Sequence, residues 1–593
     1  MWVLVEILIL ITVFSAHRFS YTHSNFSKSR LIVFCVFLQI FTVLTLFSIR
    51  DLDDEAYIWI SKFKNLFLHG KFGIQIDNSH FGESSVGVIQ YLISGLVWKI
   101  SKITPEQSLV ITSIFISSGF FVAIYFLLLH KKLILRLGYL SYILLALSPS
   151  FVLNTSHAMD NLGGGLALWL WLLARNNSFD GRYKKLRLLI SGFSPLIRFE
   201  LVILPLVELM RLIFTREEKF QTKIIDTFYL IGPMFFYSCY RYWAFQDLIP
   251  AMVQLKGFQF NPILFQSGVQ YFNQVFSYSF FLALVSIILF LIKTRLNFYS
   301  IKSNFDLFLV SSFLLFTPVI TGGDYYGGIY ARYYIEFLLL TYLILILGVS
   351  KFSVEPFRLL KRKVKWVKYI QIQSMLLFFV LVFLAPWHYF DFEKNLRQSN
   401  YGRVTCDQSV ASLVFSAIPN ARSVATSEIF SFNYVTGMSL IDLMGGADTR
   451  NFPAKSNPWP SDPMHIRFDF KNKISVSKPD LIWAYGSAAC PFYAHFPSNE
   501  VYSLAKKGKY QEAFDFIYKS ERELWRIGSP ESLSKKYNKV LLSFRDISDS
   551  NNESNVLGRN LFAVMYLKQG FRVQTKQLAN SNYDVAVYFL NTN

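Results

Sequence analysis

The chain has 593 residues, of which 53% are hydrophobic and only 17% are charged. This charge content is low for a soluble globular protein, and several apolar runs approach the ~20 residues that a helix needs to cross a bilayer. The net charge of +20 does not indicate nucleic-acid binding. Its lysines and arginines lie in short clusters between apolar runs, as the positive-inside rule describes for membrane proteins.

Apolar runs occupy the chain to about residue 387, and each is a candidate membrane helix. About twelve can be distinguished, at residues 2–17, 31–49, 106–129, 133–149, 158–174, 186–197, 200–214, 226–243, 276–293, 306–321, 333–349 and 369–387. The first run lacks a basic n-region and an A-x-A cleavage site, so we interpret it as a membrane helix and not as a cleaved signal peptide. Residues 86–102 are amphipathic, and we expect them to lie along the membrane interface.

Basic residues alternate between the two ends of these runs. They cluster near residues 18–30, 131–136, 175–187, 211–223, 293–302 and 358–368, whereas the short loops at the opposite ends hold almost none. By the positive-inside rule, the basic ends face the cytoplasm. The N-terminus, the loop 51–105, the loop "TGGDYYGGIYARYY" and everything after about residue 388 are then predicted to lie outside the cytoplasm.

The composition changes after residue 387. Residues 388–593 contain turn signals such as "NFPAKSNPWPSDP", β-rich stretches such as "SVATSEIF" and "VLLSF", and a helical pattern over 499–526. We predict a soluble extracytoplasmic α/β domain here, following a membrane domain at 1–387. Cys406 and Cys490 both lie in this part. They could form a disulfide if it is extracytoplasmic, because such a compartment is oxidising.

Three acids follow the run 31–49, at Asp51, Asp53 and Asp54. One interpretation is a helix N-cap for a helix that begins near Glu55, because acids suit the positive end of the helix dipole. The other is a general base, which sugar transfer to a hydroxyl requires. Two neighbouring carboxylates can take different catalytic roles, and the charge of one can raise the pKa of the other. The same loop carries His80 and Glu83 in a glycine-containing polar stretch.

Other ionisable residues lie at the same predicted membrane face. Arg198 and Glu200 separate two apolar runs, and we weigh an interhelical salt bridge against a phosphate site for the guanidinium. His157 and Asp160 are three residues apart, which predicts one helical face; an ion pair, a metal site and a plain N-cap all remain open. A further loop combines paired glycines with Asp324, Tyr325 and Arg332, and we expect substrate contacts there.

The order of these segments resembles a family. The segments are "DLDDEAYI", "HFGESSVG", "HAMDNLGGGLALW", "PLIRFELV", "GGDYYGGIYARYY" and then "IPNARSVATSEIFSFNYVTGMSLIDLMGG". Together they resemble the GT-C membrane glycosyltransferases, and within them the group of terminal arabinofuranosyltransferases of cell-wall arabinan synthesis and related bacterial proteins. The resemblance covers most of residues 31–450.

The resemblance implies an extracytoplasmic active site, a polyprenyl-phosphate sugar donor and catalysis by the acidic motif of the first outer loop. This motif corresponds to Asp53 and Asp54, of which Asp53 is the favoured base. The family often has Gly-Met-Glu where this chain has residues 157–160, Arg-Pro-Glu or a similar motif at 198–200, and Gly-Gly-Asp-Trp/Phe-Met at 322–326. These departures leave the sugar and the acceptor open.

We therefore predict a polytopic α-helical protein of the bacterial cytoplasmic membrane, with both termini and the active site on the periplasmic side. It would transfer a sugar from a polyprenyl-phosphate donor to a glycan, lipid or protein acceptor. No cofactor is required, although a divalent metal ion near the acids is compatible with the sequence. The alternatives are a lipid-linked glycan transporter or flippase, and a non-catalytic envelope-assembly scaffold.

Eleven residues carry this prediction, in three roles. The predicted base is Asp53 or Asp54, the donor phosphate is assigned to Arg198, Arg332 and Glu200, and the sugar pocket to His80, Glu83, His157, Asp160, Asp324 and Tyr325.

Overall fold

The computed structural model divides the chain into two compact units. Unit 1 comprises residues 1–52, 86–240 and 258–390, and unit 2 comprises residues 53–85, 241–257 and 391–593. The structure describes residues 28–48, 54–70, 73–75, 81–82, 87–129, 139, 141–143, 145–146, 148–158, 160–176, 181–214, 220–245, 248, 262–276, 305–322, 333–352, 418, 420–426, 437–442, 470–483, 488–489, 507, 509, 512, 536–546, 561–570 and 583–590.

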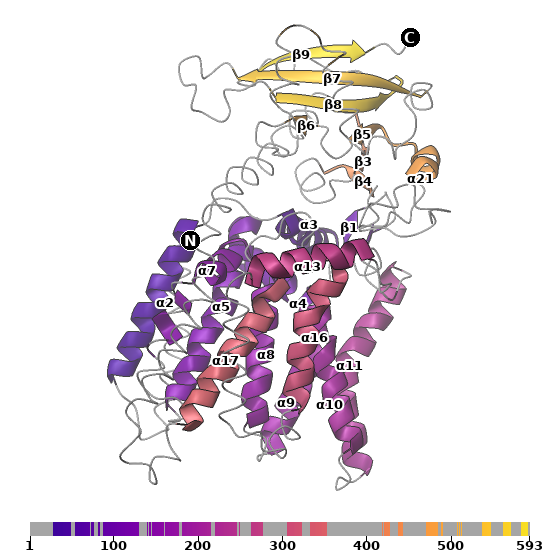
Figure 1. Cartoon of the computed structure of the whole chain (residues 1–593). Helices are drawn as coiled ribbons and strands as arrows, with labels where there is room; N and C mark the ends of the chain where they lie inside the picture. Colours follow the sequence, from indigo (N-terminus) through magenta and orange to yellow (C-terminus); the bar gives the residue numbers. More distant parts are fainter. Residues whose placement is uncertain are drawn as a thin grey trace, which may run out of the picture. The chain divides into compact units, whose positions relative to one another are not determined.

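Unit 1 is helical, and its helices pack side by side (Figure 1). They are α2 (Lys28–Ser48), α4 (Val88–Ser101), α5 (Pro105–Leu129), α7 (Pro149–Ser156), α8 (Asn161–Asn176), α9 (Gly181–Ile197), the 3-10 helix η1 (Phe199–Val202), α10 (Ile203–Phe214), α11 (Phe220–Phe245), α13 (Pro262–Phe276), α16 (Phe305–Thr321) and α17 (Ile335–Phe352). Helix α8 is central, since it contacts α5, α9 and α17.

Local sequence signals set several helix boundaries. At the start of α5, the Gln107 backbone N–H donates to Thr104 Oγ1 at 3.2 Å, and the Thr104 N–H donates to Gln107 Oε1 at 3.3 Å. This capping box stabilises a helix that begins with a proline at its first position. Helix α7 has the same type of start, because Ser148 Oγ accepts from the Phe151 N–H and Pro149 follows the cap.

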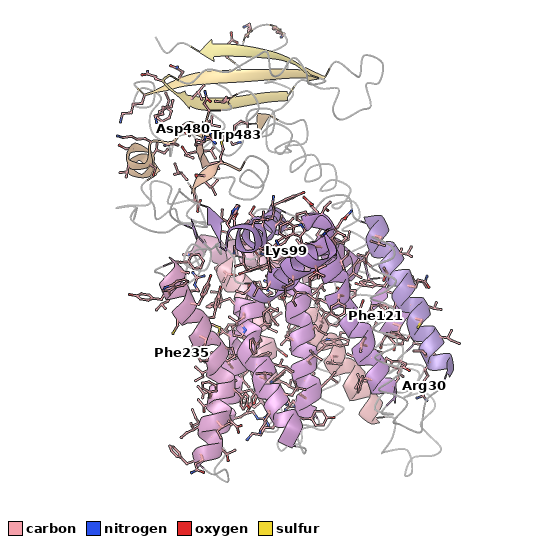
Figure 2. All side chains as sticks on the ribbon, turned by 180° about the vertical axis from the view of Figure 1, so that it is seen from behind. Arg30, Lys99, Phe121, Phe235, Asp480 and Trp483 are labelled. Atoms are coloured by element: carbon pink, nitrogen blue, oxygen red, sulfur yellow. The ribbon has the colours of Figure 1, made fainter. Side chains whose placement is uncertain are left out.

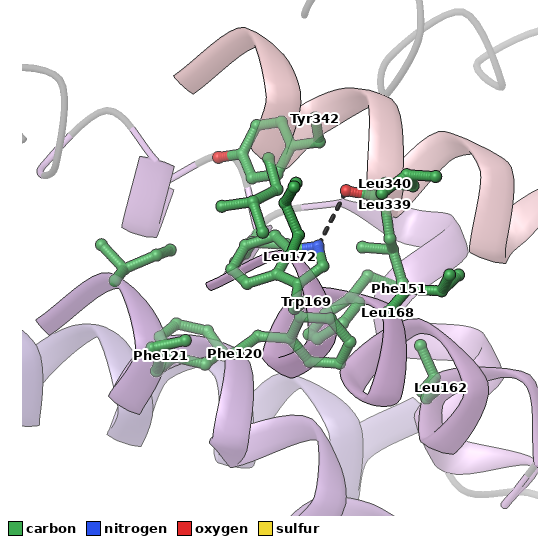
Figure 3. Packing of buried hydrophobic residues seen from close by; sticks show 14 of the residues in the cluster. Phe120, Phe121, Phe151, Leu162, Leu168, Trp169, Leu172, Leu339, Leu340 and Tyr342 are labelled. Atoms are coloured by element: carbon green, nitrogen blue, oxygen red, sulfur yellow. Dashed lines mark hydrogen bonds between the residues drawn. The ribbon is translucent and has the colours of Figure 1, made fainter. Parts of the chain in front are cut away.

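An aromatic core surrounds α8 (Figure 3). The buried Trp169 ring meets Phe120 edge-on at 4.9 Å between ring centroids, and its indole Nε1–H donates to the Leu339 carbonyl of α17 at 2.8 Å. Phe120 in turn meets Phe151 of α7 at 5.4 Å. One tryptophan thus joins the α5, α7 and α17 helices to α8, and its indole nitrogen is satisfied although it is buried.

The outer faces of unit 1 carry large apolar side chains. On α11, Phe228, Phe235 and Phe236 are each more than half exposed (Figure 2 labels Phe235). Among the described residues, one helix, Pro105–Leu128, is long and apolar enough to cross a membrane by length and composition. The prediction of a mostly helical chain with a smaller sheet is confirmed, and the count of about twelve spans stays a prediction.

Most predicted apolar runs that the structure describes are helical. The runs 2–17 and 369–387, nearly all of 276–293 and much of 133–149 lie outside the described residues. The run 200–214 begins as the 3-10 helix η1 before α10. The amphipathic segment 86–102 forms α4 and ends at Lys102 in the left-handed region, with φ of 56°.

Unit 2 contains α3 (Asp54–His69), β1 (Ile74–Gln75), β2 (Phe81–Gly82), β3 (Ser423–Thr426), β4 (Ser439–Asp442), α21 (Phe470–Ser477), β5 (Leu481–Trp483), β6 (Ala488–Ala489), β7 (Tyr537–Asp546), β8 (Leu561–Lys568) and β9 (Tyr583–Leu590). Seven strands form one sheet in the order β4-β3-β5-β8-β7-β9, with β6 paired to β8. The first three are parallel, and the others pair antiparallel. The stretches "SVATSEIF" and "VLLSF" contribute strands as predicted, whereas 499–526 lies almost entirely outside the described residues.

The junction before β3 and β5 is held by Asp480. Its Oδ2 accepts from the backbone N–H groups of Arg422 and Ser423 at 3.0 and 3.2 Å. The buried Tyr537 hydroxyl donates to the neighbouring Pro479 carbonyl at 3.0 Å. Side chains therefore satisfy backbone groups at the point where two parallel strands begin, which fixes their alignment.

Replacing Trp169 with alanine tests the core of unit 1. We expect the free energy of unfolding to fall by ~3–5 kcal/mol, because a large buried ring leaves a cavity. The neighbouring Leu170, which is 43% exposed, is the matched control, and Leu170→Ala should cost less than ~1 kcal/mol. Denaturant unfolding in detergent micelles measures both. Equal losses in the two variants would contradict this packing.

The pKa of Tyr537 supplies a second test. Burial, with the negative charge of Asp480 acting in the same direction, raises this pKa from 10 to about 12. A raised pKa in the folded state contributes stability that is complete below the unfolded pKa and is lost as the pH rises through the folded pKa. The stability difference between wild type and Tyr537→Phe should therefore be constant up to pH 10 and shrink towards pH 12. Denaturant midpoints over this range measure it, and a difference independent of pH would contradict the assignment.

Candidate functional site

The candidate site lies where α9 ends and η1 begins. Arg198 stands between these two helices in extended conformation, and its backbone N–H donates to the Ser194 carbonyl at 3.0 Å. The Ser194 hydroxyl bonds the carbonyls of Ser191 and Leu201, so it ties the two helices across the turn. The Arg198 side chain is buried as a result of this turn.

Three carboxylates surround the Arg198 guanidinium. Nη1 lies 2.8 Å from Asp160 Oδ1, Nη2 lies 3.0 Å from Glu200 Oε1, and Nε lies 2.9 Å from Glu336 Oε1. Nη1 also donates to Asn161 Oδ1. We call these five residues the Arg198 cluster. It joins the start of α8, η1 and the first turn of α17, which are far apart in the sequence.

The Arg198 cluster is exposed to the outside mainly at Glu200. The Glu200 side chain is 33% exposed, whereas those of Arg198, Asp160 and Glu336 are nearly buried. The Tyr333 ring lies with its centroid 5.9 Å from Arg198 Cζ, so an aromatic face covers part of the guanidinium. A polar ligand could therefore reach the cluster from the Glu200 side.

Two glycines allow the backbone to approach these carboxylates. A Cβ added at Gly87 would meet Asp160 Oδ2 at 2.8 Å, and one at Gly164 would meet Glu336 Oε1 at 3.1 Å. Both distances are tighter than ordinary van der Waals contacts. Gln90 of α4 donates to the Ala158 carbonyl at 3.0 Å, which fixes the turn before α8. Helix α4 thus supports the cluster through both Gly87 and Gln90.

Carboxylates predominate in the described part of the cluster. Among the described residues, one guanidinium faces three carboxylates. An ionised carboxylate accepts hydrogen bonds and donates none, so the cluster suits a ligand that donates them, as sugar hydroxyls do. A phosphate, in contrast, would have to compete with three anions for the same guanidinium fork.

The structure brings together three of the predicted residues, namely Arg198, Glu200 and Asp160. The salt bridge between segments, one of the two interpretations of Arg198 from sequence, is present. Glu336 was missed, although an acid inside the apolar run 333–349 is the kind of signal that marks such sites.

One local prediction was wrong. His157 and Asp160 do not share a helical face, because α7 ends at Ser156 and residues 157–158 and 160 form a turn before α8. The physical reason is Ala158, whose φ of 58° lies in the left-handed region and breaks the helix. His157 is the C-cap of α7, with its N–H donating to the Leu153 carbonyl at 2.9 Å.

The remaining predicted residues are not described. Helix α3 begins at Asp54, near the helix start expected at Glu55, but the side chain of Asp54 is outside the description. Both the backbone and the side chains lie outside the described residues at Asp51, Asp53, His80, Glu83, Asp324, Tyr325 and Arg332. Within the described part of the chain, no group of three His, Cys, Asp or Glu side chains is arranged to hold a metal ion.

Models of known protein families give no match to this chain, and no curated protein sequence matches it significantly.

A glycine substitution tests the support of the cluster by α4. In Gly87→Ala, the new methyl group would lie 2.8 Å from Asp160 Oδ2 and 3.3 Å from the Ile197 carbonyl oxygen, so Asp160, which pairs with Arg198, or the backbone must shift. We expect a loss of ~1–3 kcal/mol in the free energy of unfolding, as for other overpacked sites. Gly232→Ala on α11 is the control, since its added Cβ would meet nothing closer than 3.8 Å. Thermal melting measures the loss of stability in both variants. An equal loss in Gly87→Ala and Gly232→Ala would contradict the role of Gly87.

Proposed function

We propose that the chain is a membrane glycosyltransferase that moves a sugar from a polyprenyl-phosphate donor to a hydroxyl of a glycan, lipid or protein acceptor. The observation that carries this proposal is the Arg198 cluster, in which the described residues place three carboxylates around one guanidinium inside a helical unit with apolar outer faces. The proposal places the active site on the periplasmic side of the bacterial cytoplasmic membrane.

The apolar exterior supports the membrane setting. Exposed phenylalanine, isoleucine and leucine side chains recur on α2, α10, α11 and α16. Soluble monomers rarely expose apolar patches of this kind, whereas lipid chains would cover them at no cost. A donor with a polyprenyl tail would then reach the protein through the same lipid phase.

The carboxylates of the cluster support a sugar ligand. Carboxylates accept hydrogen bonds from sugar hydroxyls, and Glu200 has the solvent access that such contact requires. We assign Arg198 the role of a positioning residue, because it holds Asp160, Glu200 and Glu336 in place. The first contact with the donor phosphate is assigned mainly to Arg332.

The chemical step needs a base. We assign it to Asp53 or Asp54, as the acidic motif suggests. The carboxylate takes the proton of the acceptor hydroxyl while its oxygen forms a bond to the anomeric carbon. The bond between that carbon and the phosphate oxygen breaks, and polyprenyl phosphate leaves with the electron pair. No redox partner or cofactor enters this balance.

An apolar stretch between charged groups favours transfer over transport. The described charges at α8 lie at Asp160, just before its start, and at Arg175 near its end, and the buried side chains from Leu162 to Ala174 are aliphatic or aromatic, such as Leu162, Leu168 and Trp169. A transport path for a polar glycan would need polar groups along its length.

The decisive experiment measures release of polyprenyl phosphate. Wild type, Asp53→Asn and Asp54→Asn are purified in lipid and offered a panel of polyprenyl-phosphate sugars with candidate acceptors. We expect turnover by wild type and a loss of ~10²–10⁴-fold in the variant that lacks the base. Glu512→Gln removes an exposed carboxylate paired with Lys509 and should leave turnover unchanged.

Thermal melting controls for folding of each variant. Unchanged turnover in both aspartate variants would rule out this base. Absence of turnover with every donor would contradict the transfer function and favour the transporter or the scaffold.

A further inference from the structure

Helix α13 crosses the end of α16 and packs closely against it (Figure 1). A Cβ added at Gly268 would clash with the backbone carbonyl of Val319, so the two helices approach each other at backbone distance there. The hydroxyl of the buried Ser267 donates to the Gly322 carbonyl at 3.2 Å, directly after the end of α16. A close backbone contact and a hydrogen bond therefore fix the position of α13 on α16.

The inner side of α13 reaches the Arg198 cluster through aromatic rings. The buried Tyr271 ring stacks on Tyr334 at 5.4 Å between ring centroids and meets Tyr333 edge-on at 6.3 Å. Tyr333 is the ring that covers part of the Arg198 guanidinium, with its centroid 5.9 Å from Cζ. Three residues further along the chain, Glu336 pairs with the same guanidinium at 2.9 Å. One aromatic ring thus separates the buried side of α13 from the candidate site.

The outer side of α13 carries a row of carboxamides. Gln266, Gln270 and Asn273 are exposed, and their spacing of four and then three residues places them on one face of the helix. The row extends over about 10 Å, at 1.5 Å per residue. The buried residues that hold α13 in place lie on the opposite face. We call these three exposed residues the amide row.

The side chains of this helix carry no charge. None of the residues Pro262–Phe276 is Asp, Glu, Lys, Arg or His, although the whole chain has a net charge of +20. An amphipathic helix on a membrane surface typically has lysine and arginine on its polar face, where they attract anionic lipids. The amide row therefore does not have the chemistry of a site for anionic headgroups. Each carboxamide instead offers both donors and an acceptor, which is the combination that hydroxyl groups require.

We propose that the amide row binds a neutral glycan, and that this glycan is the acceptor of the transfer. The role as acceptor rests on the proposed function, whereas glycan binding stands on α13 alone. The amide N–H groups donate to hydroxyl oxygens of the glycan, and the amide oxygens accept from its hydroxyl hydrogens. Phe265, which is 39% exposed and precedes Gln266, packs against the C–H side of a sugar ring.

The position and chemistry of the row favour the acceptor over the donor. The phosphate of a polyprenyl-phosphate donor calls for a cation, and α13 has none. A hydroxyl acceptor needs only neutral hydrogen bonds. Because the contacts with α16 and Tyr333 hold α13 in place, a glycan bound to the row keeps a constant position relative to the Arg198 cluster, and such positioning lowers the entropic cost of reaction.

The test measures binding without a donor, so its result does not depend on turnover. The full chain is incorporated into phosphatidylcholine nanodiscs and titrated with neutral hexasaccharides of arabinose, galactose, glucose and mannose, each labelled with an uncharged fluorophore. We expect saturable binding of at least one of them, with empty nanodiscs as the blank. The affinity should be the same at about 0.05 M and about 0.5 M salt, because no charged group takes part.

The double variant Gln266→Ala/Gln270→Ala tests the row. Loss of one neutral hydrogen bond weakens binding by ~2- to 10-fold, so we expect the affinity of the double variant to be ~5- to 100-fold weaker. Gln221→Ala is the matched control, because Gln221 is an exposed carboxamide on a different helix, α11. It should bind as wild type does. Alanine is favourable at exposed helical positions, so the melting temperatures should not fall in any variant.

The transfer assay separates this proposal from the proposed function. The double variant should raise the KM for the acceptor by the same factor and leave kcat unchanged, because the row binds the acceptor equally in the ground state and the transition state. Glycan binding to the row without turnover of any donor would reject transfer and retain the glycan surface. Turnover with an unchanged KM in the double variant would reject the surface and retain transfer.

Three binding results would overturn the proposal. They are no binding of any of the hexasaccharides, wild-type affinity in the double variant, and an equal loss of affinity in Gln221→Ala.

Discussion

The buried Arg198 guanidinium is the interaction on which the candidate site depends. It draws carboxylates from α8, η1 and α17 to one point, so three segments that are up to 176 residues apart in sequence share one electrostatic centre, from Asp160 to Glu336. A buried ion pair is seldom a net source of stability, because desolvation offsets the attraction, but removal of one partner is severe. The cluster is therefore better understood as a constraint on geometry than as a source of stability.

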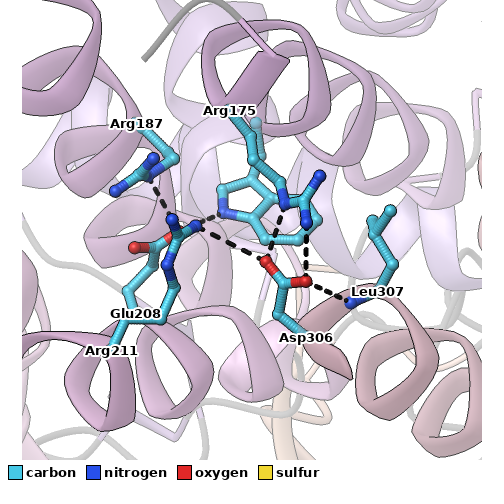
Figure 4. Close-up of polar contacts among 7 residues, drawn as sticks. Arg175, Arg187, Glu208, Arg211, Asp306 and Leu307 are labelled. Carbon is cyan, nitrogen blue, oxygen red and sulfur yellow. Dashed lines mark hydrogen bonds and ion pairs between the residues drawn. The ribbon is translucent and has the colours of Figure 1, made fainter. Parts of the chain in front are cut away.

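Unit 1 holds two separate groups of buried charges. Among the described residues, the partners of Arg198 are carboxylates, and the partners of Glu208 and Asp306 near the other end of α8 are arginines (Figure 4). Between them, Trp169 and its aromatic neighbours form an apolar layer that excludes charge. Apolar packing therefore separates the two groups of charges.

The sheet of unit 2 depends on a different interaction. Its parallel strands begin next to Asp480, whose carboxylate accepts the backbone N–H groups at the start of β3. The antiparallel strands β7, β8 and β9 are long and pair continuously, so they form the stable part of the sheet. Helix α3, which begins at the proposed catalytic Asp54, belongs to this unit through its contact with β1.

The sequence alone determined the local elements. Apolar runs predicted α2, α5, α16 and α17 within a few residues, whereas α7 lies between the predicted runs 133–149 and 158–174. These features depend on neighbouring residues, so a pattern reveals them. The left-handed Ala158 escaped prediction, since nothing about alanine indicates that conformation.

Only the tertiary structure decided which charges meet. The partners of Arg198 are Asp160 and Glu336, and those of Asp306 are Arg175 and Arg211, and each pair spans a sequence separation that no local pattern encodes. Helix packing around α8 brings them together, because a buried charge must find a partner wherever the packed helices place one. The residue types and their cost in an apolar setting were visible in the sequence, whereas their pairing required the fold.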